Sequence, residues 1–429
     1  MIRKRERNAI VQSLAAGVVP ALGLQHIQVG RVHEVEAVIS DLQQIQAGGA
    51  AFRLIVGRFG SGKTFFVNLL KTIAVKRKLV VVQADITSDR RLHGTGGKAR
   101  SLFSELIANM TVRSSPEGGA LRAIIERWIE EVTFSVSKAG GSDSDVTAEI
   151  VSRLRPLRDL PRGFDFSRVL ACYYEGFQTG NEALQQSAVR WLRAEYSTKT
   201  EAKNDLGVRS IIGDSDFYDA LKLLAAFTKI CGLQGLLVVL DELVVLSHRL
   251  NSTQARNNNY EQILRILNDC LQGRAEHLGF LFAATDECLE DERRGLCSYE
   301  ALATRLAPNR FARGTLTDMT GPVIRLNNLT AEDCYVLLEN VRRVFSGEAN
   351  ETKLLPDAGI QGFLESCHQR MGDDYFRTPR DTVMGFLNLL QILEQNPEAD
   401  WQDLLKNGVD RQERPADATG HSDLADFRL

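Results

Sequence analysis

Residues Gly57 to Thr64, GRFGSGKT, have the types and spacing of a loop that holds nucleotide phosphates. They match GxxxxGK[ST], a pattern whose glycines let the backbone turn its N–H groups toward phosphate oxygens. A helix that starts at the lysine adds the positive end of its dipole. We expect Lys63 to reach the β- and γ-phosphates and the Thr64 hydroxyl to hold Mg²⁺. The predicted phosphate-loop residues are Gly57, Arg58, Phe59, Gly60, Ser61, Gly62, Lys63, Thr64 and Phe65.

A glycine-rich turn without a ligand is the alternative. The context favours the phosphate loop, because an apolar strand precedes it and an amphipathic helix follows it.

A second candidate site is the end of the apolar run LLVVLDE, at Asp241 and Glu242. A carboxylate at such a strand tip can complete the coordination of Mg²⁺. The neighbouring Glu242 can polarise a water molecule for attack on the γ-phosphate. A strand that merely ends in acidic residues is the alternative. Next to an intact phosphate loop, the two carboxylates favour hydrolysis over phosphoryl transfer to a small molecule, since a small-molecule kinase needs no base aimed at water.

Two further stretches offer polar groups. Thr285 and Asp286 follow the apolar run GFLFAA, and a polar residue there could orient the attacking water. The stretch ALATRLAPNRFARG contains Arg305, Arg310 and Arg313, and any one of them could act in trans as an arginine finger on a neighbour's nucleotide. Surface arginines are the alternative for each.

Arg380 stands at the start of a late predicted helix, in FRTPRD. Pro379 before it suits the first turn of a helix. From that position Arg380 could reach the γ-phosphate, or it could be an ordinary surface arginine.

The basic stretch SDRRLHGTGGKAR places four cations around glycines, which would allow a backbone approach to nucleic-acid phosphates. Interleaved aromatic residues are absent from it, so stacking on single-stranded bases is not supported. A solvated loop, or one that closes over the bound nucleotide, is the interpretation that charge runs usually favour.

Five apolar runs of strand length must position these groups. Helical patterns separate them, which predicts an α/β fold of the P-loop NTPase kind, with a parallel sheet flanked by helices. The expected strands are residues 51–57, 79–86, 235–243, 278–286 and 322–326.

The composition excludes several classes of protein. A net charge of -3 gives no global attraction to nucleic acid or anionic lipid. The longest apolar runs are of strand length, so no transmembrane helix and no membrane partner are expected. Gln12 and Ser13 interrupt the apolar part of the N-terminus, which favours an amphipathic helix over a signal peptide. The seven cysteines contain no CxxC pair, which indicates buried free thiols in a reducing cytoplasm.

The order of the motifs resembles the AAA+ ATPases, specifically the origin-recognition/Cdc6-like branch. In that branch a VGR box precedes the phosphate loop and lies near the adenine, and Val29-Gly30-Arg31 looks like that box. The resemblance implies a homo-oligomer. It also implies these roles: sensor 1 for Thr285 or Asp286, arginine finger for Arg305 or Arg310, and sensor 2 for Arg380.

A closer resemblance lies in other stretches. RNAIVQSLAAGVVPALGLQHIQVGR, RRLHGTGGKARSLFSELIANM and the terminal DLADFRL look like the BrxD-type ATP-binding proteins of bacterial BREX phage-exclusion systems. This resemblance implies antiphage defence beside an Lhr-like helicase or another defence-island component.

From these patterns we expect four parts in the chain. They are N-terminal helices with the adenine-side box (1–50), a P-loop ATPase core (51–326) with a helical insertion at about 98–230, a C-terminal helical lid (327–410) and an extended polar tail (411–429). No winged-helix pattern follows the lid, so the sequence does not support direct binding to duplex DNA and does not demonstrate DNA as a partner.

The sequence therefore predicts a cytoplasmic, oligomeric ATPase that uses ATP and Mg²⁺ to remodel a protein or DNA partner. The alternative is a slow ATP-gated switch that scaffolds a helicase-containing defence complex. A kinase is the third hypothesis, and the Asp241-Glu242 pair argues against it.

Overall fold

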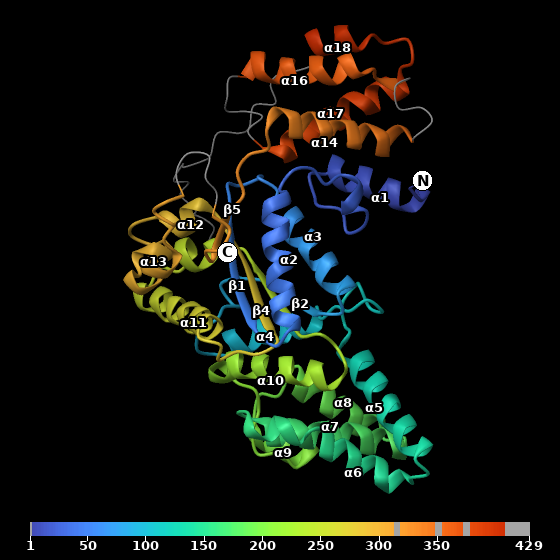
Figure 1. Ribbon diagram of the computed structural model, residues 1–429, viewed down its shortest axis with the longest axis vertical. Helices are drawn as coiled ribbons and strands as arrows, with labels where there is room; N and C mark the ends of the chain where they lie inside the picture. The colour runs from blue at the N-terminus through green and yellow to red at the C-terminus, as the bar shows by residue number, and fades with distance from the viewer. Residues whose placement is uncertain (1, 313–317, 348–353, 372–377, 408–429) are drawn as a thin grey trace, which may run out of the picture. The chain divides into compact units, whose positions relative to one another are not determined.

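The described strands form one parallel sheet in the order β2-β3-β4-β1-β5 (Figure 1). The computed structural model describes residues 2–312, 318–347, 354–371 and 378–407. All five expected strands are present and the parallel arrangement is confirmed. The strands are β1 (Ala50–Val56), β2 (Val80–Asp85), β3 (Leu236–Asp241), β4 (Leu278–Ala284) and β5 (Val323–Arg325).

Both faces of the sheet are buried, which explains why the strands are almost continuously apolar. Side chains alternate along each strand, so neighbouring residues enter different cores. Ile55 and Val81 pack on one face with α2 (Val32–Gln46) and α3 (Lys63–Lys76). Leu54 and Val82 belong to the larger core on the other face.

The chain folds into two compact units, one of residues 30–328 and one that combines residues 1–29 with 329–429. The larger unit contains the sheet. Its other helices are α4 (Lys98–Ala108), α5 (Leu121–Lys138), α6 (Asp143–Arg153), α7 (Gly163–Thr179), α8 (Glu182–Leu192), α9 (Lys199–Leu206), α10 (Phe217–Ile230), α11 (Thr253–Leu271), α12 (Asp286–Glu290) and α13 (Glu300–Leu306).

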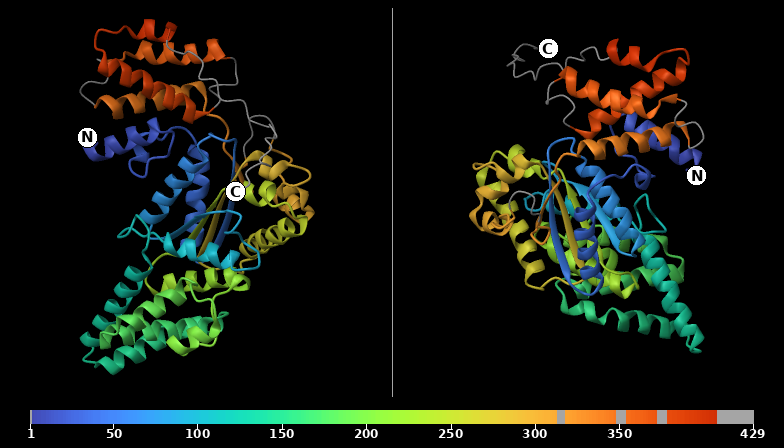
Figure 2. Two further views of the ribbon diagram at one scale, coloured as in Figure 1. Left: turned by 180° about the vertical axis from the view of Figure 1, so that it is seen from behind. Right: turned by 45° about the horizontal axis from the view of Figure 1, so that its top comes forward.

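The long interval between β2 and β3 is helical from α4 to α10. Of these helices, α4 contacts β2 and α10 contacts β3, while α5 to α9 pack together beyond the sheet (Figure 2). Edge-to-face rings join this bundle to α10: the Phe227 ring centroid lies 5.8 Å from that of Trp128 and 5.3 Å from that of Phe166. The insertion is therefore anchored on the sheet through its first and last helices.

The smaller unit is helical and joins the two ends of the chain. Its helices are α1 (Lys4–Ala15), α14 (Ala331–Ser346), α16 (Asp357–Met371), α17 (Pro379–Gln395) and α18 (Trp401–Asn407). Helix α1 packs against α14 and α17. Trp401 and Leu405 of α18 contact α16 near Gly362. The predicted polar tail and Arg313 lie outside the described residues.

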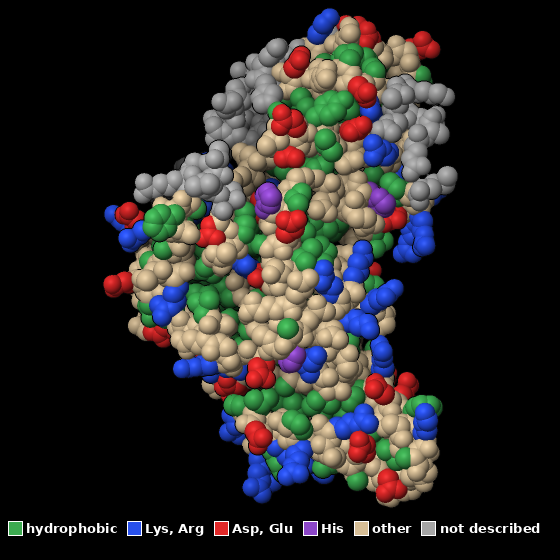
Figure 3. Space-filling model, viewed as in Figure 1, with side chains coloured by type: hydrophobic (Ala, Val, Ile, Leu, Met, Phe, Trp, Pro, Cys, Tyr) green, Lys and Arg blue, Asp and Glu red, His purple; other side chains and the backbone are tan. Residues whose placement is uncertain are grey.

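The cysteines are free thiols, as expected, but only Cys172, Cys270 and Cys288 are buried and the other four are partly exposed. Within the described residues no helix is long and apolar enough to cross a membrane. On the face shown in Figure 3, Lys and Arg side chains gather along one side of the middle of the molecule and at its lower end, while Asp and Glu are scattered.

A buried ion pair fixes α2 on the phosphate-loop strand. Arg53 in β1 donates from Nε to Asp41 Oδ2 (2.6 Å) and from Nη2 to Asp41 Oδ1 (2.9 Å). The two side chains are only 10% and 13% exposed. Burial raises the pKa of Asp41, and the guanidinium of Arg53 offsets part of that effect.

We expect Arg53→Met to lower the free energy of unfolding by about 3–5 kcal/mol, because it leaves the Asp41 carboxylate buried without its cation. The matched control is Arg122→Met, whose partner Glu126 and own side chain are 40% and 47% exposed. That loss should stay below about 1 kcal/mol. Urea unfolding followed by circular dichroism measures both. Equal losses in the two variants would show that the Arg53–Asp41 pair does not hold α2 in place.

Candidate nucleotide-binding site

The loop between β1 and α3 has the backbone that the glycine spacing predicted. Gly60 and Gly62 have φ of 79° and 89°, a left-handed conformation that favours glycine. Gly57 has no room for a side chain, since a Cβ there would lie 2.7 Å from Ser61 Oγ and 3.1 Å from the Leu326 carbonyl oxygen. Glycine is therefore favoured at all three positions, by the backbone conformation at two of them and by the lack of space at the third.

The polar groups of this loop fit a polyanion. Lys63 Nζ donates to the carbonyl oxygens of Gly57 and Arg58, at 2.8 Å each. Among the described residues, the N–H groups of Gly60 and Gly62 have no protein acceptor, and the buried Ser61 hydroxyl has no hydrogen-bond partner. Phosphate oxygens would accept hydrogen bonds from these donors. The Lys63 ammonium could then turn from the loop carbonyls to the same phosphate oxygens.

Four other predicted phosphate-loop residues lie around this cradle. Arg58, Phe59 and Thr64 are exposed, and the Phe59 side chain is 70% exposed. Phe65 is half-buried in the first turn of α3.

The two predicted Mg²⁺ ligands lie together. Thr64 Oγ1 donates to Asp241 Oδ2 over 3.4 Å, and Asp241 is 7% exposed at the tip of β3. Burial raises the pKa of Asp241; the N–H of Glu242 and the Lys63 ammonium oppose that shift, and the carboxylates of Glu242 and Asp85 add to it. A hydroxyl and a crowded carboxylate with excess negative charge are ligands that suit Mg²⁺.

Asp85 is a functional candidate that the sequence reasoning missed. It ends β2 and is paired in register with Asp241 at the end of β3. The signal was present in LVVVQAD, an apolar strand that ends in a carboxylate as β3 does. What the sequence lacked was the adjacency of the two strands.

Glu242 has a left-handed backbone, with φ of 60°. A side chain with a Cβ is disfavoured there by about 1–2 kcal/mol. Hydrogen bonds on both sides hold the conformation: Glu242 N–H donates to Asp241 Oδ1 (2.8 Å) and Val245 N–H donates to the Glu242 carbonyl (3.0 Å). Strain of this kind is typical of residues placed for function.

Arg31 of the predicted adenine-side box contacts the phosphate loop directly. Its Nη2 donates to the Ser61 carbonyl oxygen (2.8 Å) and to the Asn327 carbonyl oxygen (3.2 Å). Gly30 and Arg31 have φ of 60° and 59°. Val29 is the last residue of the smaller unit's N-terminal segment, and Gly30 begins the larger unit.

Thr285 and Asp286 follow β4, which lies between β1 and β3. The Thr285 hydroxyl accepts a hydrogen bond from Cys288 N–H (3.2 Å) and so caps α12. The Asp286 carboxylate forms an ion pair with Arg325 at 3.3 Å. Of the two, Thr285 has the side chain that is not already committed to a charged partner.

The arginines differ in their surroundings. Arg305 donates from Nε to Asn268 Oδ1 (2.6 Å) and from Nη1 to the Ala301 carbonyl (2.8 Å), so it is held within its own chain. Arg310 is exposed. Arg380 belongs to the smaller unit, where it is exposed in the first turn of α17, after the cap Thr378.

The basic stretch at residues 88–100, which leads into α4, is held by contacts with the rest of the protein. Arg90 pairs with Glu105 at 2.8 Å and Arg100 Nη1 donates to the Tyr196 carbonyl at 3.1 Å. The Asp214 carboxylate accepts from the N–H groups of Gly97 and Arg100 and so caps the helix. These contacts favour a structural loop over a nucleic-acid surface.

A parallel sheet buried on both faces, with a glycine loop, a lysine and a helix N-terminus after its first strand, defines a P-loop nucleotide-binding protein. The family model for the BREX system ATP-binding protein BrxC/D matches residues 2–409, so the chain belongs to this family. The predicted resemblance to BREX ATP-binding proteins is thereby confirmed. No curated protein matches the chain.

We expect Asp241→Asn to raise the thermal midpoint of the ligand-free protein. The raised pKa means that the folded state binds the proton more tightly than the unfolded state, so stability is lost as pH rises from the ordinary value of 3.8 through the folded value. The gap between Asp241→Asn and wild type should therefore widen over that range and stay constant at neutral pH. Scanning calorimetry across pH measures it.

The control is Asp89→Asn, whose carboxylate is 85% exposed. It should change stability by less than about 0.5 kcal/mol at every pH. A lower midpoint for Asp241→Asn than for wild type would show that the neighbours stabilise this carboxylate.

Proposed function

We propose that this BREX ATP-binding protein is an AAA+ ATPase that hydrolyses ATP with Mg²⁺ bound at Thr64 and Asp241. The observation that carries this proposal is the position of β4 between the phosphate-loop strand and the Asp241 strand. Because Thr285 directly follows β4, this strand order supports a position for Thr285 between the phosphate loop and the Asp241-Glu242 pair. Hydrolysis requires a base and a water-orienting group that both reach the water attacking the γ-phosphate.

In this proposal each residue has a distinct task. Lys63 leaves the loop carbonyls and neutralises the β- and γ-phosphates, and the loop N–H groups bind the remaining oxygens. Glu242 accepts a proton from the attacking water. Arg31, through the Ser61 carbonyl, sets the position of the loop next to the adenine side.

The proposed context is antiphage defence, in which an oligomer converts hydrolysis into remodelling of a protein or DNA partner. An Lhr-like helicase or another defence-island component is the proposed protein partner, on the resemblance to BrxD-type proteins. Arg380 as sensor 2 would couple the smaller unit to the nucleotide, and Arg305 or Arg310 would couple a neighbouring subunit.

We expect Glu242→Gln to reduce ATP turnover at least about 100-fold, because general-base catalysis is lost while the loop is intact. ATP binding should be retained, which a fluorescent nucleotide titration checks. Lys63→Ala should lose binding itself, and the exposed Glu130→Gln should match wild type. Hydrolysis is measured as phosphate release with and without DNA.

A second function is favoured by the contacts of Arg305. Because Arg305 is bonded to Asn268 and Ala301 of its own chain, an isolated subunit holds one finger candidate away from any neighbour. The protein would then bind ATP, turn it over slowly and act as a switch that scaffolds a defence complex. Equal ATP binding by wild type and Glu242→Gln, with no hydrolysis by either even with DNA, would support this switch over the motor.

We expect Arg310→Ala to abolish hydrolysis without weakening ATP binding, if Arg310 acts on a neighbour's nucleotide. Mixing Arg310→Ala with Lys63→Ala should then restore part of the activity. At mixed interfaces the Lys63→Ala subunit supplies the arginine to an intact site. Arg305→Ala should mainly cost stability, about 1–2 kcal/mol from its two hydrogen bonds. Failure of the mixture to recover any activity would argue against a trans role for Arg310.

A further inference from the structure

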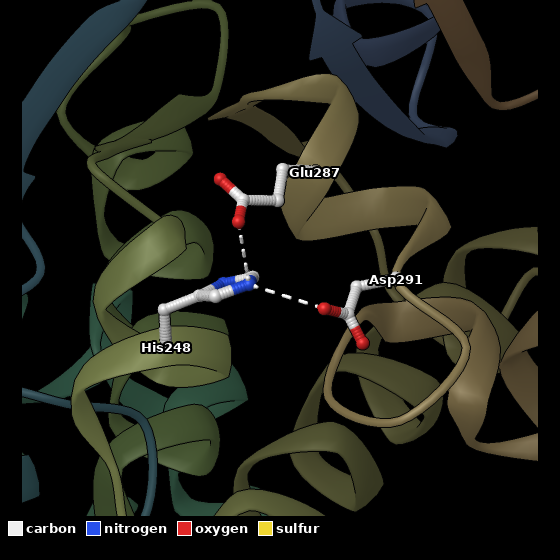
Figure 4. A group of neighbouring side chains, drawn as sticks. All are labelled: His248, Glu287 and Asp291. Atoms are coloured by element: carbon white, nitrogen blue, oxygen red, sulfur yellow. Dashed lines mark ion pairs between the residues drawn. The ribbon is translucent and has the colours of Figure 1, made fainter.

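Three potential metal ligands meet in the segments that follow β3 and β4. His248 lies on a single π-helical turn, Val245–Arg249, shortly after β3, while Glu287 lies on α12 and Asp291 directly follows it (Figure 4). His248 Nε2 is 3.2 Å from Glu287 Oε1 and 3.5 Å from Asp291 Oδ2. One ligand atom from each residue lies within 4.8 Å of the others. The cluster thus joins the segments that follow two neighbouring strands.

The other ring nitrogen of His248 is already engaged. Nδ1 lies 2.7 Å from Ser247 Oγ, and the same hydroxyl donates to the Val244 carbonyl at 3.0 Å. When the hydroxyl proton points to that carbonyl, Ser247 Oγ accepts from Nδ1–H. A neutral imidazole in this tautomer directs its Nε2 lone pair toward the two carboxylates. Metal-binding histidines are held in the same way, through a hydrogen bond from the non-ligating nitrogen.

The Nε2 atom faces two carboxylates, so it must either carry a proton or share a cation with them. It is buried and meets no hydrogen-bond criterion, and one oxygen of each carboxylate lies near it at ion-pair distance. A lone pair facing two carboxylates is repulsive unless a proton or a metal ion lies between them. Two ligand atoms held about 2.1 Å from a cation, at angles of about 90–110°, lie about 3.0–3.5 Å apart. The two observed nitrogen-to-oxygen distances agree with that spacing.

We propose that His248 Nε2 and the carboxylates of Glu287 and Asp291 bind one divalent transition-metal ion, for which Zn²⁺ is best suited. An imidazole nitrogen favours Zn²⁺ and similar ions over Mg²⁺ and Ca²⁺, which prefer oxygen ligands. The Glu287 side chain is 66% exposed, so an ion can enter from solvent and water can complete its coordination.

The site has a structural consequence. A bound ion would fasten the turn after Asp241 and Glu242 to the helix that Thr285 caps. The proposed base and the proposed water-orienting group would then be held at a constant separation. This consequence rests on the proposed function, whereas metal binding itself does not.

The first experiment is calorimetric titration of the full-length, tag-free, chelator-treated protein with Zn²⁺. We expect one site that His248→Ala and the more conservative Glu287→Gln each weaken at least about tenfold. The matched control is His26→Ala, because His26 pairs with a single carboxylate, Glu6, at 3.6 Å. It should bind as wild type does. Circular dichroism of the metal-free variants confirms that they fold.

Co²⁺ provides a second readout because its visible spectrum reports its ligands. We expect a spectrum without thiolate charge transfer, which distinguishes this site from adventitious binding to the free cysteines. Zn²⁺ should also raise the thermal midpoint of wild type but not of Glu287→Gln. Thiolate bands, or equal Zn²⁺ affinity in wild type and His248→Ala, would overturn the proposal.

A protonated His248 paired with the two carboxylates is the remaining outcome. It would appear as no Zn²⁺ binding above that of His248→Ala, together with protons on both ring nitrogens by NMR, and it too would overturn the metal site. Glu242→Gln should bind Zn²⁺ as wild type does. The metal-site proposal and the ATPase proposal can therefore be refuted independently of each other.

Discussion

The parallel alignment of β1, β4 and β3 is the constraint on which the candidate site depends. Val56 pairs with Ala284 and Leu240 with Phe282, so the three strands end at nearly the same level. Whatever follows each strand must therefore emerge at one edge of the sheet. The phosphate loop, Thr285 and the Asp241-Glu242 pair are distant in sequence and adjacent only for this reason. The same alignment brings the segments that carry His248 and Glu287 together.

Unfavourable features concentrate at that edge. Arg31 and Glu242 have left-handed backbones, Asp241 is a buried carboxylate close to two others, and the Ser61 hydroxyl is buried without a hydrogen-bond partner among the described residues. Each of these costs free energy in the ligand-free protein. The sheet tolerates them because its strands bury apolar side chains on both faces. A bound cation and polyanion would remove part of this cost. The apolar core that keeps these groups in place does not depend on either ligand.

One of the two compact units is discontinuous in sequence. Helix α1 packs with α14 and α17, so the smaller unit needs both ends of the chain, whereas the larger unit is one continuous segment. The helical insertion belongs to that larger unit and is anchored through α4 and α10. Contacts made by Asp214 and Asn259 hold the basic loop before α4, which explains how charged residues next to the sheet can be structural.

Local chemistry determined the phosphate loop, the five strands and the acidic tip of β3, because each is encoded within a few adjacent residues. Three features can be recognised from the local sequence alone, without knowledge of distant residues. They are a glycine at a required turn, a lysine at a helix start and an apolar run buried on both faces. Only the tertiary structure decided that Asp85 stands beside Asp241, that Arg31 binds the Ser61 carbonyl, that Arg305 is held by Asn268, and that His248 meets Glu287. These contacts depend on strand order and on packing between segments remote in sequence, and neither local periodicity nor composition specifies which strand lies next to which.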